Sequence, residues 1–387
     1  MPQLNLALAS VEDYRREAER RLPRALFDYL DGGSYGELTL SRNAADFAQL
    51  QLRQRVLRDV SNIKTHTTLF GRELTLPAAL APIGMAGLMR RRAEVQAKAA
   101  CDGAGIPFTL STVSICPLEE VAAVSALPFW FQLYMLRDRD AVTDMLKRAR
   151  AVGVNTLVFT VDLSVVGARY RDVRNGLSGN PGTWGKLRAG PLSYMAHPRW
   201  LVDTGIRGRP HQFGNLTPYV PNATTPANFK GWLDSQIDPT VTWKDIEWLR
   251  QQWPGDLIIK GVLDPDDALA AIDCGADGIV VSNHGGRQLD AVASTASLLP
   301  TIVSAIAGRA VCLVDSGIRS GQDILKAKAL GADGVLIGRP WVYAVAAQGQ
   351  RGVRQLLETF RSELSVSMAL TGSTDLSEVD TRILDRG

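Results

Sequence analysis

The sequence predicts an α/β fold, a (β/α)8 barrel of the TIM type, from three observations. Short apolar segments of strand character recur eight times along the 387-residue chain. Segments of helical character separate most of them, and eight strands is the number that closes such a barrel. The phrase Gly-Ala-Asp-Gly occurs at 275–278 and again at 331–334, which indicates one helix-to-strand turn used twice. We therefore expect a single domain over residues 1–387.

A helical preamble is expected before the barrel, over residues 1–68. Ser10 is predicted as the N-cap of a first helix, because acidic residues follow it and the helical pattern continues to Arg21. A second helix is predicted over residues 23–30, ending at the two glycines that follow Asp31.

The barrel strands are predicted where short runs of apolar, often β-branched residues end in polar loops. They are 78–81, 108–110, 130–133, 157–161, 257–260, 278–281, 311–314 and 335–337. The clearest helices between them are 92–103, 140–152, 264–274, 297–307 and 321–330. Glycines at positions 153, 275 and 331 are typical of turns that end helices.

A long excursion separates the fourth and fifth strands. It covers residues 164–256 and is rich in Pro, Gly, Arg and Trp. Connections of this length inside a domain are usually functional, so we expect it to lie over the mouth of the barrel, at the carboxyl ends of the strands.

Composition excludes several classes of protein. A hydrophobic content of 45% and a charged content of 21% are ordinary for a soluble globular chain. The net charge of +3 is too small to indicate nucleic acid as a partner. The four cysteines lie far apart without a Cys-x-x-Cys pair, so we expect a reducing cytoplasm and neither disulfides nor a metal site. The N-terminus does not resemble a signal peptide, and no apolar run of ~18 residues occurs.

The stretch Ser-Asn-His-Gly-Gly-Arg at 282–287 most strongly indicates chemistry. It follows a buried strand, and active sites of parallel α/β proteins lie at such carboxyl ends. His284 can accept a proton near neutral pH, and Arg287 can hold a carboxylate with two hydrogen bonds. Alternatively, His284 packs in a loop and Arg287 is solvated. A turn alone would not require this motif, so we favour a functional role.

Polar residues gather at the ends of the other strands as well. Loops 315–321 and 338–339, after the seventh and eighth strands, fit the phosphate site common in these barrels. Lys260 ends a buried strand, where an ammonium group needs an anionic partner. Alternatively, Tyr29 and Tyr134 are aromatic residues that only pack, and Asp162 only caps a loop.

These motifs resemble the FMN-dependent 2-hydroxy-acid dehydrogenase and oxidase family. The match runs from about residue 11 to about residue 371, and rests most on 282–287, 159–162 and 315–319. The resemblance implies FMN as cofactor and oxidation of an L-2-hydroxy acid to a 2-oxo acid. It is greatest to bacterial respiratory members that oxidise L-lactate to pyruvate and pass electrons to quinone or another membrane acceptor. We expect no haem-binding domain before the barrel.

The resemblance also implies roles for individual residues. His284 matches the general base and Asp162 the carboxylate that orients it. The substrate-binding positions are Tyr29, Tyr134, Arg169 and Arg287. The cofactor-binding positions are Ser111, Gln132, Thr160, Lys260, Asp315, Ser316, Gly317, Ile318, Arg319, Gly338 and Arg339. Two mechanisms stay open. In one the proton leaves from oxygen with hydride transfer, and in the other it leaves from carbon through a carbanion.

The sequence leaves alternatives open for the substrate and for the class of protein. Gly84 is expected to leave extra room beside the substrate side chain, so mandelate and glycolate remain candidates, as does an oxidase. A flavin-free phosphate-binding barrel, with Lys260 as Schiff-base lysine of a lyase or isomerase, is a further alternative, as is a binding scaffold.

The composition of the excursion indicates where in the cell the protein is located. Residues 169–213 hold eight basic and two acidic residues, together with Trp184, Leu187, Tyr194, Met195 and Trp200. Basic and aromatic residues together suit an anionic membrane surface, although a substrate lid or a subunit contact is the alternative. With the resemblance, this predicts peripheral attachment at the cytoplasmic face of the inner membrane. The family also implies a homo-oligomer, commonly a tetramer.

Overall fold

The computed structural model describes residues 8–177, 191–220, 232 and 235–385. Eight parallel strands form one sheet in the order β3-β10-β9-β8-β7-β6-β5-β4. A parallel bridge between Leu80 and Phe108 joins its two edges, so the predicted barrel is confirmed. The strands are β3 (Ala78–Leu80), β4 (Thr109–Ser111), β5 (Trp130–Leu133), β6 (Thr156–Thr160), β7 (Asp256–Val262), β8 (Gly278–Val281), β9 (Val311–Val314) and β10 (Gly334–Ile337).

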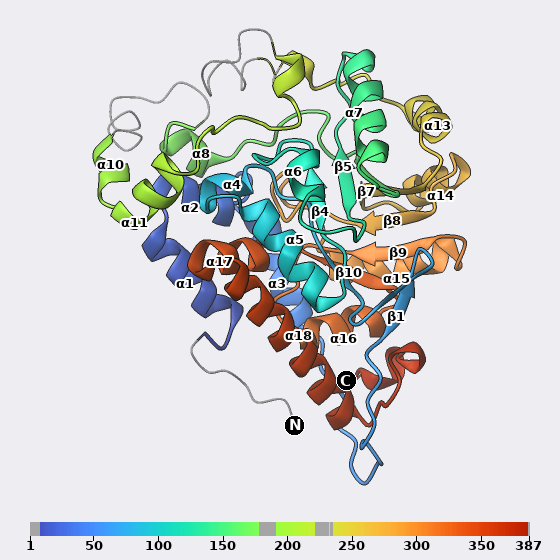
Figure 1. The fold of residues 1–387 in the computed structure, drawn as a ribbon. Coiled ribbons are helices and arrows are strands. Elements are labelled where there is room, and N and C mark those ends of the chain that lie inside the picture. Colours follow the sequence, from blue (N-terminus) through green and yellow to red (C-terminus); the bar gives the residue numbers. More distant parts are fainter. Residues whose placement is uncertain (1–7, 178–190, 221–231, 233–234, 386–387) are drawn as a thin grey trace.

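Helices alternate with these strands around the barrel (Figure 1). All eight predicted strands and all five predicted helices are present, each with ends within two residues of the prediction. The helices are α5 (Ala93–Ala104), α6 (Leu118–Ala122), α7 (Arg139–Ala151), α13 (Trp243–Gln252), α14 (Pro265–Asp273), α15 (Thr295–Ile306), α16 (Gly321–Ala329), α17 (Arg339–Gln348) and α18 (Gln350–Thr371).

The two Gly-Ala-Asp-Gly turns make the same contact. Asp277 Oδ2 accepts a hydrogen bond from the backbone N–H of Leu257, and Asp333 Oδ2 accepts one from that of Cys312, each at 2.8 Å. The glycines that open the two turns have φ of +90° and +101°, a region that side chains disfavour. The repeated phrase therefore encodes a turn that fastens each new strand to its neighbour.

The barrel interior is filled with apolar side chains. Val158, Ile258, Val280 and Leu313 are each 1% exposed or less and belong to one cluster inside the barrel. A hairpin of β1 (Thr67–Leu69) and β2 (Arg72–Leu74) contributes further apolar residues to this cluster. The hairpin lies against the starts of β8 and β10, so it closes the amino-terminal end and leaves the carboxyl end for a site.

The preamble is helical over only part of its predicted length. It contains α1 (Val11–Arg21), α2 (Arg24–Asp31) and α3 (Leu38–Gln49), and Ser10 caps α1 as predicted. The expectation of helix up to residue 68 was wrong beyond α3. From there to residue 66 the chain has no helix, because its backbone groups bond to the C-terminal segment, as in the 2.8 Å bond from Lys64 N to Thr374 O.

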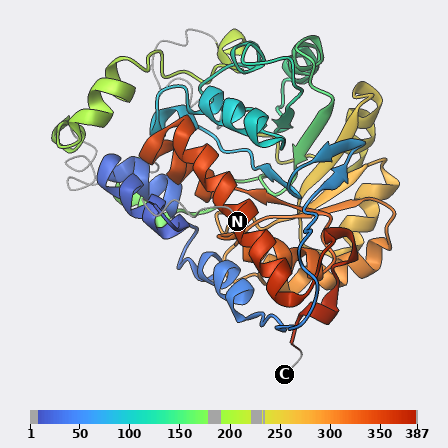
Figure 2. The ribbon, with the colours of Figure 1, turned by 60° about the horizontal axis from the view of Figure 1, so that its bottom comes forward.

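The excursion packs against the preamble. Its described part includes α8 (Tyr170–Arg174), α10 (Pro191–Met195) and α11 (Pro198–Trp200), which lie on the same side of the barrel as α1 and α2 (Figures 1 and 2). Asn175 Nδ2 donates to Asp28 Oδ2 at 2.7 Å, fastening the excursion to α2. Helix α13, near the end of the excursion, packs beside α14 as part of the outer ring. Trp184 and Leu187 lie outside the described residues.

Within the described ranges, no helix combines the length and apolar character needed to cross a bilayer.

Candidate active site

A cavity of about 590 Å³ opens at the carboxyl end of the barrel. All of the predicted site residues line it except Ser111, Gln132, Thr160 and Asp162, and each of those four lies within two residues of the carboxyl end of a strand. The strand ends therefore bring together residues that are far apart in the sequence, as the barrel predicts.

His284 and Asp162 form the most specific contact in the cavity. His284 Nδ1 lies 2.8 Å from Asp162 Oδ1. The carboxylate accepts a hydrogen bond here, so Nδ1 carries the hydrogen and Nε2 is the nitrogen that can accept a proton. His284 has φ of +57°, and its backbone N–H donates to Ser282 Oγ at 3.1 Å, which helps hold this unfavourable backbone conformation.

The environment favours a neutral imidazole beside an ionised carboxylate. Burial lowers the pKa of His284, and the charges of Lys260 and Arg169 act in the same direction against the opposing effect of Asp162. Burial alone would raise the pKa of Asp162, but the neighbouring His284 and Lys260 hold it below its usual value. His284 can thus serve as a base at neutral pH.

Lys260 has the anionic partner that its burial requires. Its Nζ lies 3.2 Å from Asp315 Oδ2 and donates to Ser282 Oγ at 2.9 Å, while only 4% of the residue is exposed. Burial opposes the charge, yet Asp315 and Asp162 raise the pKa of Lys260 above its usual value. Ser282 Oγ therefore joins this ammonium group to the backbone of His284.

Two arginines make one side of the cavity cationic. Arg287 Nη1 donates to the carbonyls of Tyr29 and Gly32, at 2.6 and 2.9 Å, and its guanidinium lies over the Tyr29 ring at 4.8 Å. Arg169 Nε approaches the carbonyl of Arg287 at 3.5 Å. Burial, with the charge of Arg169, lowers the pKa of Arg287 to about 9. An anion such as a carboxylate would stabilise both guanidinium groups.

The aromatic substrate-binding candidates lie in the same wall. Tyr29 and Tyr134 both line the cavity. Burial raises the pKa of Tyr134, and the nearby Asp162 adds to this effect, so its hydroxyl stays protonated as a hydrogen-bond donor at neutral pH.

Several buried polar side chains lie beside the barrel interior, and not all of their atoms are hydrogen-bonded. Ser111 Oγ donates to Gln132 Oε1 at 2.9 Å, which orients the amide of Gln132. Gln132 Nε2 and Thr160 Oγ1 are buried and have no hydrogen-bond partner among the residues that the structure describes. Buried polar groups of this kind usually mark a ligand or an ordered water.

The loops after β9 and β10 form a narrow cradle. Gly317 has φ of +133°, and a Cβ there would lie 2.3 Å from the carbonyl oxygen of Asn43. A Cβ on Gly285 would lie 2.7 Å from Arg339 Nη1. Ser316 Oγ accepts from the N–H of Gly285 at 2.9 Å, joining this cradle to the loop of His284. The cradle also includes Asp315, Ile318, Arg319 and Gly338.

The expectation of extra room at Gly84 was wrong. A Cβ at this position would lie 2.6 Å from Val113 Cγ2 and 3.8 Å from the Tyr29 hydroxyl. Val113 therefore fills the space that the missing side chain leaves. Local sequence could not show this, because the two residues follow different strands.

Some residues of the site escaped the sequence reasoning. Asn43, on α3, bonds to Asn283 beside the base. Asp31, the last residue of α2, is bound by Arg15 and Arg171. His211 and Phe213 bring the excursion to the cavity wall. His211 is one of four histidines in the sequence, which is the one signal that could have singled it out. The described part of the chain contains no cluster of His, Cys, Asp and Glu suited to a metal ion.

Comparisons with known proteins identify the family of this chain. A family model described as FMN-dependent dehydrogenase matches residues 18–386. An L-lactate dehydrogenase of Caulobacter sp. (strain K31) is 53% identical, covering 98% of this chain and 99% of that protein. One of Pseudomonas putida (strain GB-1) is 52% identical, covering 97% of each.

Solved structures give the same result. A monotopic membrane protein, (S)-mandelate dehydrogenase, superposes with a TM-score of 0.92 at 34% identity, covering 98% of this chain and 100% of that one. A mandelate oxidase superposes with a TM-score of 0.83 at 37% identity, covering 97% and 98%. With a family model that spans nearly the whole chain and relatives above half identity, this chain belongs to the FMN-dependent dehydrogenase family.

Proposed function

We propose that this protein is an FMN-dependent L-lactate dehydrogenase that oxidises L-lactate to pyruvate and passes the electrons to a membrane quinone. The observation that carries the proposal is the 2.8 Å contact of His284 with Asp162, beside two arginines and a buried lysine in one cavity. The names of the relatives support lactate as the substrate.

The residues present fit FMN. Gln132 Nε2, a donor, and Thr160 Oγ1, a donor and acceptor, are buried without a partner in the described part of the chain, as a polar ring edge requires. With Ser111 and Lys260 they would hold the isoalloxazine. The cradle after β9 and β10 would hold the ribityl chain and phosphate through Asp315, Ser316, Gly317, Ile318, Arg319, Gly338 and Arg339. When bound, FMN supplies the two-electron acceptor of the reaction.

The chain's own residues would then orient the substrate and move its proton. Arg287 and Arg169 would hold the carboxylate, and the hydroxyls of Tyr29 and Tyr134 would position the reacting end. His284 would accept the proton at Nε2 as the alcohol carbon becomes a carbonyl. Asp162 would hold the imidazole in the required tautomer and stabilise the imidazolium that forms. Lys260 would place a positive charge beside the bound cofactor.

Surface composition supports attachment to a membrane. Large apolar side chains are exposed along the excursion, among its basic residues. They are Val165, Val166, Tyr170, Val173, Met195, Val202 and Ile206. Such a surface suits the boundary of an anionic bilayer, where a quinone is available. Peripheral attachment at the cytoplasmic face of the inner membrane, by a homotetramer, is part of the proposal, and a structural relative is a monotopic membrane protein.

An anaerobic absorbance spectrum tests the proposal. Purified protein reconstituted with FMN should lose its oxidised flavin band fastest with L-lactate, and more slowly with (S)-mandelate or glycolate. A ubiquinone analogue should then restore the band in the absence of oxygen. Faster bleaching by mandelate would assign a different substrate, and a protein that binds no flavin would overturn the proposal.

A further inference from the structure

One backbone carbonyl joins the substrate side of the cavity to the cofactor side. Gly32 O accepts from Arg287 Nη1 at 2.9 Å and from Arg339 Nη2 at 2.8 Å. Gly32 is the C-cap of α2. The same helix end offers the carbonyl of Tyr29 to Arg287 at 2.6 Å and that of Leu30 to Arg339 at 3.1 Å. The last turn of α2 thus satisfies its free carbonyls with two guanidinium groups, which also suit the negative end of a helix.

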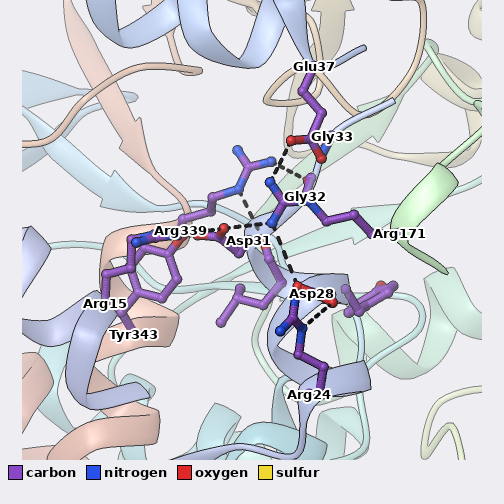
Figure 3. A network of polar contacts seen from close by, with 12 residues as sticks. Arg15, Arg24, Asp28, Asp31, Gly32, Gly33, Glu37, Arg171, Arg339 and Tyr343 are labelled. Atoms are coloured by element: carbon purple, nitrogen blue, oxygen red, sulfur yellow. Dashed lines mark hydrogen bonds and ion pairs between the residues drawn. The ribbon is translucent and has the colours of Figure 1, made fainter. Parts of the chain in front are cut away.

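The neighbouring carboxylate, Asp31, fixes this helix end. Arg15 binds it with two hydrogen bonds, from Nε at 2.7 Å and from Nη2 at 2.9 Å. The Tyr343 hydroxyl donates to it at 2.7 Å and Arg171 Nη1 at 2.9 Å. Figure 3 shows these side chains converging on Asp31 from different parts of the chain. α1, α17 and α8 each contribute a contact.

The contacts around Asp31 keep its carboxylate ionised. Its side chain is 7% exposed, and although burial opposes ionisation, the hydrogen bonds from Arg15, Tyr343 and Arg171 lower its pKa to about 2. Arg171 also binds Glu37, whose Oε1 accepts from the N–H of Gly33 at 3.0 Å. The residues on both sides of Gly32 are therefore tied to ion pairs, Asp31 through its own carboxylate and Gly33 through its hydrogen bond to Glu37.

We propose that Asp31 is a positioning residue that, through the carbonyl of Gly32, sets Arg287 for the substrate carboxylate and Arg339 for the FMN phosphate together. Arg171, on α8, links the excursion to Asp31. The proposal rests on the roles of the two arginines in the proposed function. It implies that weakening the contacts of Asp31, which lies outside both binding sites, weakens the binding of substrate and of FMN together.

The test compares Asp31→Asn and Arg171→Gln with Arg24→Gln. Arg24 also pairs with a carboxylate on α2, Asp28, at 2.8 Å, but its side chain is 73% exposed and it has no contact with Asp31. Titration of apoprotein with FMN gives the dissociation constant of the cofactor. Anaerobic flavin reduction by L-lactate separates KM from the rate at saturation.

We expect Asp31→Asn to raise both the FMN dissociation constant and the KM for L-lactate by about tenfold or more, because it weakens charged hydrogen bonds. Arg171→Gln should move both in the same direction by less, and Arg24→Gln neither. The reduction rate at saturation should change little, since His284 and Asp162 are untouched.

A change in one binding constant alone, or a fall in the saturated rate with KM unchanged, would overturn the proposal. If Asp31→Asn does not fold, Arg171→Gln and Tyr343→Phe each remove one hydrogen bond to Asp31 and must still raise both constants. If L-lactate fails to reduce the wild-type flavin, the proposed substrate is wrong. The FMN titration still decides whether Asp31 governs the phosphate side.

Discussion

Asn43 and Asn283 form a reciprocal pair of buried hydrogen bonds between α3 and the loop that carries His284. Asn43 Nδ2 donates to Asn283 Oδ1 at 2.8 Å, and Asn283 Nδ2 donates to Asn43 Oδ1 at 2.7 Å. Asn283 Oδ1 also accepts from the N–H of Gly286 at 3.0 Å. The preamble therefore stabilises the loop that presents the candidate base.

We predict that Asn43→Ala destabilises the protein and slows flavin reduction. It leaves part of a buried amide unsatisfied, which costs roughly 1–3 kcal/mol. Urea unfolding of the holoprotein measures the loss of stability, and stopped-flow absorbance measures the rate. Asn62→Ala, at an exposed position, is the control and should change neither. A stability equal to that of the wild type would mean that the pair does not support the loop.

The pH dependence should identify His284 as the base. A base must be unprotonated, so kcat/KM should fall as the pH drops through the pKa of His284, which burial places below its usual 6.5. Asp162 raises that pKa, so Asp162→Asn should move the acidic limb to still lower pH and reduce the maximal rate. His284→Gln should lose about 10²–10⁴-fold in rate. A wild-type limb above 6.5 would contradict this assignment.

Sequence reasoning succeeded where one local pattern carries the information. Strand β8 has the predicted ends because its buried run stops at a polar loop. The residues at the strand ends share a cavity because parallel strands of a barrel end on one face. The resemblance then supplied roles that spacing alone would not.

The failures have a different physical origin. Asp31 reads locally as the last residue before a glycine turn, and its partners lie up to 312 residues away in the chain. Asn43 likewise finds Asn283 across 240 residues. The chain between α3 and the barrel is irregular because it bonds to the C-terminal segment. Each of these features depends on tertiary pairing, which leaves no local pattern.

Membrane attachment predicts a specific loss on polar substitution. The double variant Met195→Ser with Ile206→Ser removes side chains that are 62% and 55% exposed on the excursion. Binding to anionic vesicles should fall about tenfold or more, because each such side chain contributes roughly 1.5–3 kcal/mol when buried. Co-sedimentation measures it.

A matched double variant controls for general surface polarity. Val366→Ser with Leu370→Ser replaces residues that are 52% and 56% exposed on α18. It should leave vesicle binding unchanged. Equal binding by both double variants and the wild type would instead favour the excursion as a lid or a subunit contact.

The contact between Gly84 and Val113 predicts coupled effects on substrate choice. Gly84→Ala places a Cβ 2.6 Å from Val113 Cγ2, so one residue must move. Overpacking typically costs about 1–3 kcal/mol, and both residues line the cavity. We expect Gly84→Ala to raise the KM for L-lactate several-fold. Val113→Ala should open the cavity and improve kcat/KM for (S)-mandelate relative to L-lactate.

The double variant decides whether this contact is responsible. With Val113 reduced to alanine, the added methyl at position 84 gains space, so Gly84→Ala should harm lactate oxidation less than it does alone. Residues in contact are expected to show such non-additivity, whereas independent ones add. The ratio of kcat/KM for the two substrates, measured across all four proteins, checks the coupling. Purely additive effects would show that Val113 does not set the space beside Gly84.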